Sequence, residues 1–430
     1  MKENQVMKKL IQLIEKGTSP YHATANVVQQ FRDGGYEPLF LNRPWKLQRG
    51  GRYYTVVQES TLIAFSVGEP TDAGMFRIAG AHTDFPGLRL KQNPEIVKNG
   101  YAQLNVEVYG GAILNTWLDR PLSVAGRVAL RSNDVFRPAT RLVDFKKPFL
   151  VIPNLAIHMN REINKGVELN RQKEMLPVAG IRGDEMTEGY FRRLLAERLS
   201  VEEEEILDYE LGLYNCDRPE YVGDAEEGPY LSAPRIDNLS GVQAIVSGML
   251  EGEGKGIRVA AFFDHEEIGS RTKQGAGSQL LCMVLEKIAD SLGYGRMGLL
   301  EGLQDSMFLS VDVGHAYHPN YPEKMDPTNQ CPLNHGLCIK EACTQAYATD
   351  SRAVAAVQQI CLKEGIPYTK YFNRSDGTSG GTLGSIASAM VPVATVDVGI
   401  PILAMHSARE LMGVADEGAL VDLLRAYYGL

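Results

Sequence analysis

The sequence predicts an α/β protein in which a mixed sheet is flanked by helices on both faces and is interrupted by a β-rich insert. From Asp237 onward, apolar strand patterns alternate with helix patterns, which is typical of a sheet covered on both faces. Between about Leu88 and Arg235, short alternating segments separated by turn residues are typical of a small antiparallel domain. We therefore predict a main domain over 1–87 and 235–430 and an insert over 88–234.

The N-terminal part is predicted to begin with two helices. Apolar residues recur at helical spacing in 1–16, whereas a signal peptide needs a continuous apolar core and a cleavage site. Ser19-Pro20 indicates the start of a second helix and Gly34-Gly35 its end. Strand candidates follow at 53–58, 61–67 and 75–81, the last two joined by the turn-rich residues 68–74.

Within the insert, 186–199 is predicted to be a helix, and the acidic run 202–205 is expected to be a solvated face. After the insert, helices are predicted at 239–251, 278–292, 352–364 and 417–428, and strands at 257–263, 306–312 and 395–398.

Size and composition restrict the class of protein. A chain of 430 residues with 44% hydrophobic and 23% charged residues suits a soluble protein of about two domains. The net charge of -9 and the lack of a dense basic patch argue against a nucleic-acid partner. No run approaches the roughly 18 apolar residues of a membrane span.

The six cysteines form no CxxC pair, so neither a zinc-thiolate site nor a disulfide framework is indicated. Free thiols suit a reducing interior, and we expect a cytoplasmic protein.

Two adjacent glutamates, Glu266 and Glu267, follow the predicted strand 257–263. Open α/β sheets place their chemistry at the carboxyl ends of their strands. Like charges this close raise each other's pKa unless a cation or hydrogen-bond donors compensate. One glutamate bound to a metal and the other left to move protons would resolve the conflict; a solvated loop is the structural alternative.

His82 follows the predicted strand 75–81. Its imidazole can bind a metal when neutral and oriented, and Asp84 could fix its tautomer by accepting the other ring N–H. A purely structural histidine is the alternative.

Asp237 precedes the predicted helix 239–251, so it could be a helix N-cap or a carboxylate that bridges two cations.

Asp312 ends the predicted strand 306–312, and His406 follows a buried strand pattern that ends near Pro401. A single metal site at the carboxyl edge of one sheet would explain why four strand-like segments end on or near a His, Asp or Glu. Nitrogen and carboxylate donors without cysteine suit zinc, cobalt or manganese. Five ligands would suit two ions bridged by one carboxylate. In sites of this kind the two ions together activate a water and polarise a carbonyl. The candidate ligands are His82, Asp237, Glu267, Asp312 and His406.

The Gly-rich segment 373–384 lacks the spacing and the following lysine of a phosphate-binding loop. Its glycines are expected to let the backbone approach a bound ligand closely.

Five strings carry a family resemblance: AHTDFP at 81–86, RIDNL at 235–239, DHEEIGS at 264–270, GHAYHPNY at 314–321 and AMHSARE at 404–410. In this order, together with shorter similarities elsewhere, they resemble the aspartyl aminopeptidase family of dinuclear metallopeptidases. The resemblance runs nearly end to end. It implies a zinc-peptidase-like catalytic α/β domain split by a β-rich dimerisation domain, and assembly into a homo-oligomer, typically a dodecamer built of dimers.

The resemblance also implies roles for the ligands. His82 with Asp312 would hold one ion and His406 with Glu267 the other, while Asp237 bridges them. The ions would be two divalent metals, with Zn²⁺ expected and Co²⁺ or Mn²⁺ as alternatives.

Glu266 would be the general base that takes a proton from the attacking water and later protonates the leaving amine. Asp84 is the second catalytic candidate. Family substrates are peptides with an N-terminal acidic residue, and Lys340 matches the residue that pairs with that side chain. His158, in the insert, would reach a neighbouring subunit's active site. The substrate-binding candidates are Lys340, His158, His315, Gly380 and Gly381.

The sequence differs from the usual family string at 373–381, in the Gly-rich segment that lines the substrate pocket in relatives. This difference motivates one alternative, a broader aminopeptidase or deacylase that uses the same metals. A non-enzymatic scaffold that keeps the fold is the other alternative.

Overall fold

The computed structural model describes residues 2–69, 76–166, 168–181, 183, 187–224, 228–252, 254–377 and 380–430, with residues 2–4 described by their backbone alone. Met75, Met186 and most of the predicted turn 68–74 lie outside these residues. The chain divides into two compact units. Unit 1 comprises Met1–Asp84, Pro219–Met405 and Glu410–Leu430, and unit 2 comprises Phe85–Arg218 and His406–Arg409.

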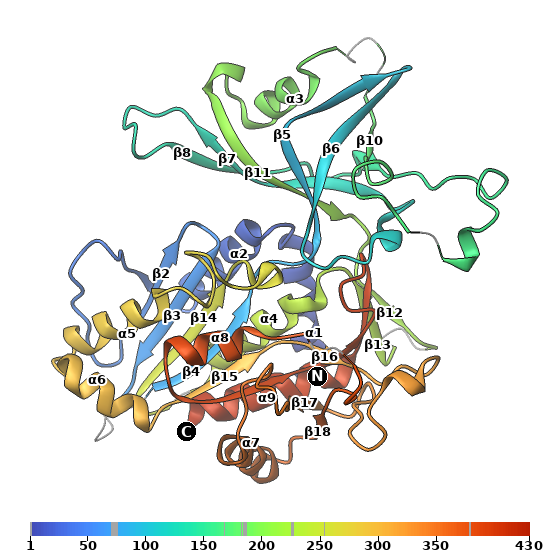
Figure 1. Cartoon of the computed structure of the whole chain (residues 1–430). Helices are drawn as coiled ribbons and strands as arrows, with labels where there is room; N and C mark the ends of the chain where they lie inside the picture. Colours follow the sequence, from blue (N-terminus) through green and yellow to red (C-terminus); the bar gives the residue numbers. More distant parts are fainter. Residues whose placement is uncertain are drawn as a thin grey trace. The chain divides into compact units, whose positions relative to one another are not determined.

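Among the described residues, unit 1 contains a nine-stranded mixed sheet in the order β1-β2-β3-β14-β4-β15-β19-β17-β18 (Figure 1). The strands are β1 Glu37–Pro38, β2 Arg52–Val57, β3 Thr61–Val67, β4 Phe76–His82, β14 Ile257–Phe263, β15 Met307–Val311, β17 Leu337–Lys340, β18 Tyr368–Tyr371 and β19 Ala394–Gly399. The neighbours β14, β4, β15 and β19 are parallel, so their carboxyl ends share one edge of the sheet.

Helices cover both faces of this sheet. Leu62 and Ala64 of β3 pack into one buried cluster, whereas Ile63 and Phe65 pack into another, because successive strand residues point to opposite faces. The first cluster contains residues of α1 Lys2–Lys16, α2 Pro20–Asp33, α4 Ile236–Glu251, α7 Ser351–Glu364 and α9 Val414–Gly429. The second contains residues of α5 Leu280–Ser291, α6 Gly295–Gln304 and α8 Leu383–Met390. The predicted fold class is confirmed.

Two helices, α6 and α8, were not expected from the sequence. Gly295, Gly298 and Gly302 lower the helix propensity of α6. The short α8 begins inside the Gly-rich segment, where glycines indicate a loop. Burial of Leu299, Leu303 and Leu383 against the sheet offsets the weak local preference.

A smaller sheet of unit 1 has the order β12-β13-β21-β20-β16. Its strands are β12 Glu220–Val222, β13 Tyr230–Ala233, β16 Gly314–His315, β20 Pro401–Leu403 and β21 Glu410–Gly413. The insert was predicted to span residues 88–234, whereas the continuous part of unit 2 spans Phe85–Arg218. The reason is that β12 and β13 pair within this sheet, β13 lying antiparallel to β21.

Unit 2 is built on an antiparallel sheet in the order β11-β5-β6-β10-β9-β7-β8, with a further pairing of β11 and β7. Its strands are β5 Gly87–Lys98, β6 Tyr101–Tyr109, β7 Leu122–Leu130, β8 Ala139–Asp144, β9 Leu150–Val151, β10 Val178–Ala179 and β11 Ile206–Asn215. The helix α3 Tyr190–Leu199 contributes to its core. Ala408 belongs to the same core, and its carbonyl accepts a 2.9 Å hydrogen bond from Asn215 Nδ2.

Among the described residues, no helix has both the length and the apolar character to cross a membrane.

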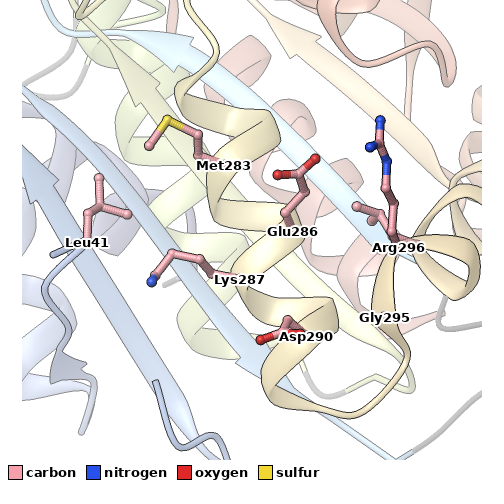
Figure 2. A pocket seen from close by; sticks show the side chains of 8 residues that line it. Leu41, Met283, Glu286, Lys287, Asp290, Gly295 and Arg296 are labelled. Carbon is pink, nitrogen blue, oxygen red and sulfur yellow. The ribbon is translucent and has the colours of Figure 1, made fainter. Parts of the chain in front are cut away.

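A surface cavity of about 490 Å³ opens beside α5 and α6. Figure 2 shows its lining, with Lys287 extending from α5 toward Leu41. The lining combines apolar Met283 and Leu299 with charged residues of both signs, and it contains none of the predicted site residues.

The first turn of α9 contains two buried acidic residues, Asp416 and Glu417. Asp416 accepts backbone hydrogen bonds from Asn334 and Gly336, at 2.8 Å each. Neither carboxyl oxygen of Glu417 has a hydrogen-bond partner among the described residues. Burial, and then the neighbouring Asp416 charge, raise the pKa of Glu417 well above its ordinary value.

Replacing Glu417 with Gln should make thermal stability less dependent on pH. The raised pKa means that the folded chain keeps a proton that the unfolded chain has released. Glu417 therefore makes the free energy of unfolding of the parent depend on pH. Its contribution is fully present below the unfolded pKa of about 4.3 and is lost as pH rises through the folded pKa. The measurement is the Tm of Glu417→Gln minus the Tm of the parent, by scanning fluorimetry. This difference should be larger at about pH 9 than at about pH 5, by roughly 1 °C or more. The same difference at both pH values would contradict this.

Candidate metal centre

His82 ends β4 and lies opposite Phe263 of the parallel strand β14. Its Nε2 atom is 3.3 Å from Asp237 Oδ1 and 3.4 Å from Asp312 Oδ1. All three side chains are buried, and their ligand atoms lie within 4.8 Å of one another. Three of the predicted ligands are thus brought together from the carboxyl ends of β4 and β15 and the start of α4.

The imidazole of His82 has a defined tautomer. Its Nδ1 atom is 2.9 Å from the backbone carbonyl oxygen of Asp84, which can only accept, so Nδ1 carries the proton. Nε2 is therefore the atom available to a metal. Asp84 was predicted to fix this tautomer, and it does so through its backbone carbonyl, while its carboxylate oxygen Oδ1 is 3.5 Å from Nδ1.

The Asp84 carboxylate instead binds the backbone that follows β14. Its Oδ1 accepts the N–H of Glu266 at 3.0 Å, and its Oδ2 accepts the N–H of Glu267 at 3.2 Å. Here the chain turns sharply through η5 (Glu266–Ile268), with His265 at φ 65° and Gly269 at φ 98° on either side. Asp84 therefore fixes the position of both glutamates relative to β4.

Glu266 and Glu267 lie close enough to His82 for one ligand atom of each to be within 4.8 Å of the others. Burial raises the pKa of Glu266 to about 8; His82 opposes the shift, and Asp312, Asp84 and Asp237 add to it. For Glu267, burial and then the Asp237 charge raise the pKa well above its usual range.

Asp237 lies where α4 departs from helical geometry. The N-cap position of the helix falls at Arg235, Asp237 and Asn238 have non-helical backbone angles, and their peptide bond is cis. The backbone N–H of Asp237 donates to Oε2 of Glu410 at 3.1 Å. Sequence reasoning assigned no role to Glu410, which is buried on β21. A buried carboxylate four residues after the candidate ligand His406 is the signal that could have identified it.

Asp312 follows β15, and its backbone lies against Gly399, where a Cβ atom would overlap the Asp312 carbonyl. Lys340 is buried beside Asp312: its Nζ donates to the Val313 carbonyl at 3.0 Å and is 3.6 Å from Asp312 Oδ2. Burial alone would lower the pKa of Lys340, but the Asp312 and Asp397 charges raise it above its usual range.

The other candidates lie in different places. His315 is exposed on β16, with its ring centroid 6.0 Å from that of Tyr371. Gly380 and Gly381 are exposed in the Gly-rich segment. His158 is exposed in a turn of unit 2.

His406 is the first residue of the segment that packs with unit 2. Its Nδ1 is 3.3 Å from the Gly111 carbonyl, which directs Nε2 away from that contact. Its role as a metal ligand remains a prediction.

The donor set of unit 1 fits divalent metal ions. Imidazole nitrogen and carboxylate oxygen, without thiolate, are donors that zinc, cobalt and manganese accept. Burial alone would lower the pKa of His82, yet the nearby carboxylates of Asp237, Asp312 and Asp84 raise it well above the ordinary value. Such a concentration of buried carboxylates favours positive charge at their centre, which a metal ion supplies.

Comparison with known proteins agrees with this chemistry. Residues 13–428 match the family described as "Aminopeptidase I zinc metalloprotease (M18)". The chain is 42% identical over 98% of its length to the "Probable M18 family aminopeptidase 2" of Clostridium novyi (strain NT), and covers 98% of that protein.

Solved structures share the fold. The structure described as "Cryo-EM structure of the Ape4 and Nbr1 complex" is 31% identical, with a TM-score of 0.94, and the match covers 100% of this chain and 86% of that one. The "Structure of S. cerevesiae mApe1 dodecamer" is 23% identical, with a TM-score of 0.84, and the match covers 99% of this chain and 96% of that one.

These matches extend over nearly the whole chain, including the buried cluster around His82. The chain belongs to the M18 family of zinc metalloproteases and is a metal-dependent aminopeptidase.

Proposed function

We propose that the enzyme removes a single N-terminal residue, preferentially Asp or Glu, from peptides, using two divalent metal ions. The observation that carries this proposal is the buried group of His82, Asp237 and Asp312 beside the Glu266-Glu267 pair. Zinc is the first choice because the family is described as zinc metalloproteases. Co²⁺ and Mn²⁺ accept the same donors.

In this proposal, His82 and Asp312 hold one ion, Glu267 and His406 hold the other, and Asp237 bridges the two. His82 Nε2 is 3.3 Å from Asp237 Oδ1 and 3.4 Å from Asp312 Oδ1, and these short distances support a shared ion at His82 and Asp312 with Asp237 beside it. When bound, the two ions would polarise the scissile carbonyl and favour ionisation of a water.

Glu266 is the proposed proton carrier. It takes a proton from the attacking water onto its carboxylate and returns it to the nitrogen of the leaving amine. Burial raises its pKa to about 8. Asp84 holds the backbone here, because its Oδ1 accepts the N–H of Glu266 and its Oδ2 accepts the N–H of Glu267. Asp84 acts by positioning Glu266 and Glu267, and its carbonyl fixes the His82 tautomer.

Lys340 is the proposed partner of an acidic substrate side chain. Its ammonium is buried, and one of its three donors is engaged by the Val313 carbonyl. Because Asp312 and Asp397 share its charge, its attraction for a substrate carboxylate is weakened. This observation favours the second candidate, a broader aminopeptidase specificity on the same metal site. His315, Gly380 and Gly381 are proposed to line the substrate pocket.

We propose a homo-oligomer, with the dodecamer as the expected form, in which His158 of one subunit reaches the active site of another. Exposed apolar side chains at Leu155, Ile157 and Met159 surround His158 in sequence and support burial of this segment on assembly. A cytoplasmic location is also proposed, because the six cysteines are all free.

Glu266→Gln should leave metal content intact and lower kcat by about a hundredfold or more, because Gln has similar size but cannot accept the proton. Metal analysis and steady-state kinetics on one peptide provide the measurement. Glu286→Gln, an exposed change on α5, is the matched control. Parent-like turnover in Glu266→Gln would exclude the assigned role.

Asp84→Asn should lower kcat about tenfold or more with little loss of metal, because the amide nitrogen cannot accept the N–H that one carboxylate oxygen now binds. Asp84→Ala, which removes both hydrogen bonds, should be less active still. If both variants retain the kcat of the parent enzyme, the proposed positioning of the glutamates is wrong.

A panel of dipeptides that differ in the N-terminal residue should show the highest kcat/KM for Asp or Glu, because Lys340 supplies positive charge in the pocket. EDTA should abolish the activity, and added Zn²⁺, Co²⁺ or Mn²⁺ should restore it. Equal rates on Leu and Asp substrates would instead support the broader specificity.

A further inference from the structure

Asp397, a fully buried residue of β19, connects three separate segments of unit 1. Its Oδ1 accepts hydrogen bonds from the hydroxyls of Ser310 at 2.5 Å and Thr382 at 2.7 Å. Its Oδ2 accepts the backbone N–H of Ala348 at 2.6 Å. The carboxylate thus joins β15, the segment before α7 and the end of the Gly-rich segment.

The contact with the Gly-rich segment is close. Thr382 is the N-cap residue of α8, so its hydroxyl ties the start of the helix to Asp397. A Cβ atom at Gly384 would lie 2.6 Å from Ser310 Oγ and 2.8 Å from Asp397 Oδ2. Only glycine lets the first turn of α8 approach the carboxylate this closely, and the helix N-terminus favours a negative charge there.

On its other side, Asp397 lies opposite Lys340 in the antiparallel pair of β17 and β19. Their charges attract each other. Lys340 in turn contacts Asp312, a candidate metal ligand. Asp397 is therefore the link between the Gly-rich segment and the lysine proposed to bind the substrate side chain.

A packing role alone would not favour a carboxylate here. Burying a charged group is costly unless it is paired and hydrogen-bonded, and an apolar residue of similar size would fill the space at lower cost. Three hydrogen bonds and one facing cation instead fit a residue that holds separate segments in one arrangement.

We propose that Asp397 is a positioning residue for substrate selection, holding residues 382–384, the end of the Gly-rich segment, and Lys340 in a fixed relation. This inference rests on the proposed function. The Thr382 hydroxyl is the connection that can be removed with least damage, because Asp397 then keeps its other hydrogen bonds.

The experiment compares Thr382→Val, which removes the hydroxyl, with Thr382→Ser, which retains it. Thr395→Val is the matched control: Thr395 is also buried, on the same strand as Asp397, and its hydroxyl donates to the Val393 carbonyl at 2.9 Å. Each variant is assayed at full length on the dipeptide panel, with metal content measured in parallel. The readout is the ratio of kcat/KM between the best and a poor N-terminal residue.

Thr382→Val should reduce this ratio by about fivefold or more, chiefly through a higher KM for the best substrate, because one buried hydrogen bond is lost. Thr382→Ser and Thr395→Val should stay within about twofold of the parent ratio, and all variants should retain metal. An unchanged ratio in Thr382→Val, or an equal loss in Thr395→Val, would overturn the inference while leaving the aminopeptidase intact. An inactive parent enzyme with bound metal would instead refute the proposed function.

Discussion

Repulsion among buried carboxylates is the constraint on which the active region depends. The parallel strands β4, β14 and β15 end at one edge of the sheet, and the residues that follow bring Asp84, Glu266 and Asp312 there together. Burial removes the water that would otherwise screen these charges. A bound divalent metal would offset the repulsion by supplying positive charge among these carboxylates. The sheet geometry and the metal chemistry are thus two parts of one arrangement.

Backbone hydrogen bonds hold this arrangement as much as side-chain contacts do. The N–H groups of Glu266 and Glu267 are bound by Asp84, and that of Asp237 is bound by Glu410. Because these bonds fix the main chain, they limit the positions that the side chains of the candidate site residues can take. Preorganisation of this kind lowers the entropy lost when metal and substrate bind.

The sequence was sufficient to predict the fold class and the meeting of His82, Asp237 and Asp312, because strand ends and residue types are local signals. It could not show that the Asp84 carbonyl, rather than its carboxylate, orients His82, since that depends on the direction of one peptide group. Glu410 was missed because its partner, the Asp237 amide, is remote in sequence. The α6 and α8 helices were missed because tertiary burial, not local preference, stabilises them.

The interruption of unit 1 by Phe85–Arg218 affects how the molecule assembles from an unfolded chain. Strand β4 pairs with β14, which follows the continuous segment Phe85–Arg218 of unit 2 in sequence. The entropic cost of closing so long a loop grows only with the logarithm of its length, and it is smaller when the loop is already compact. A compact Phe85–Arg218 segment therefore lowers the entropic cost of the β4–β14 pairing, and changes in the length of its surface turns carry little thermodynamic penalty for the catalytic sheet.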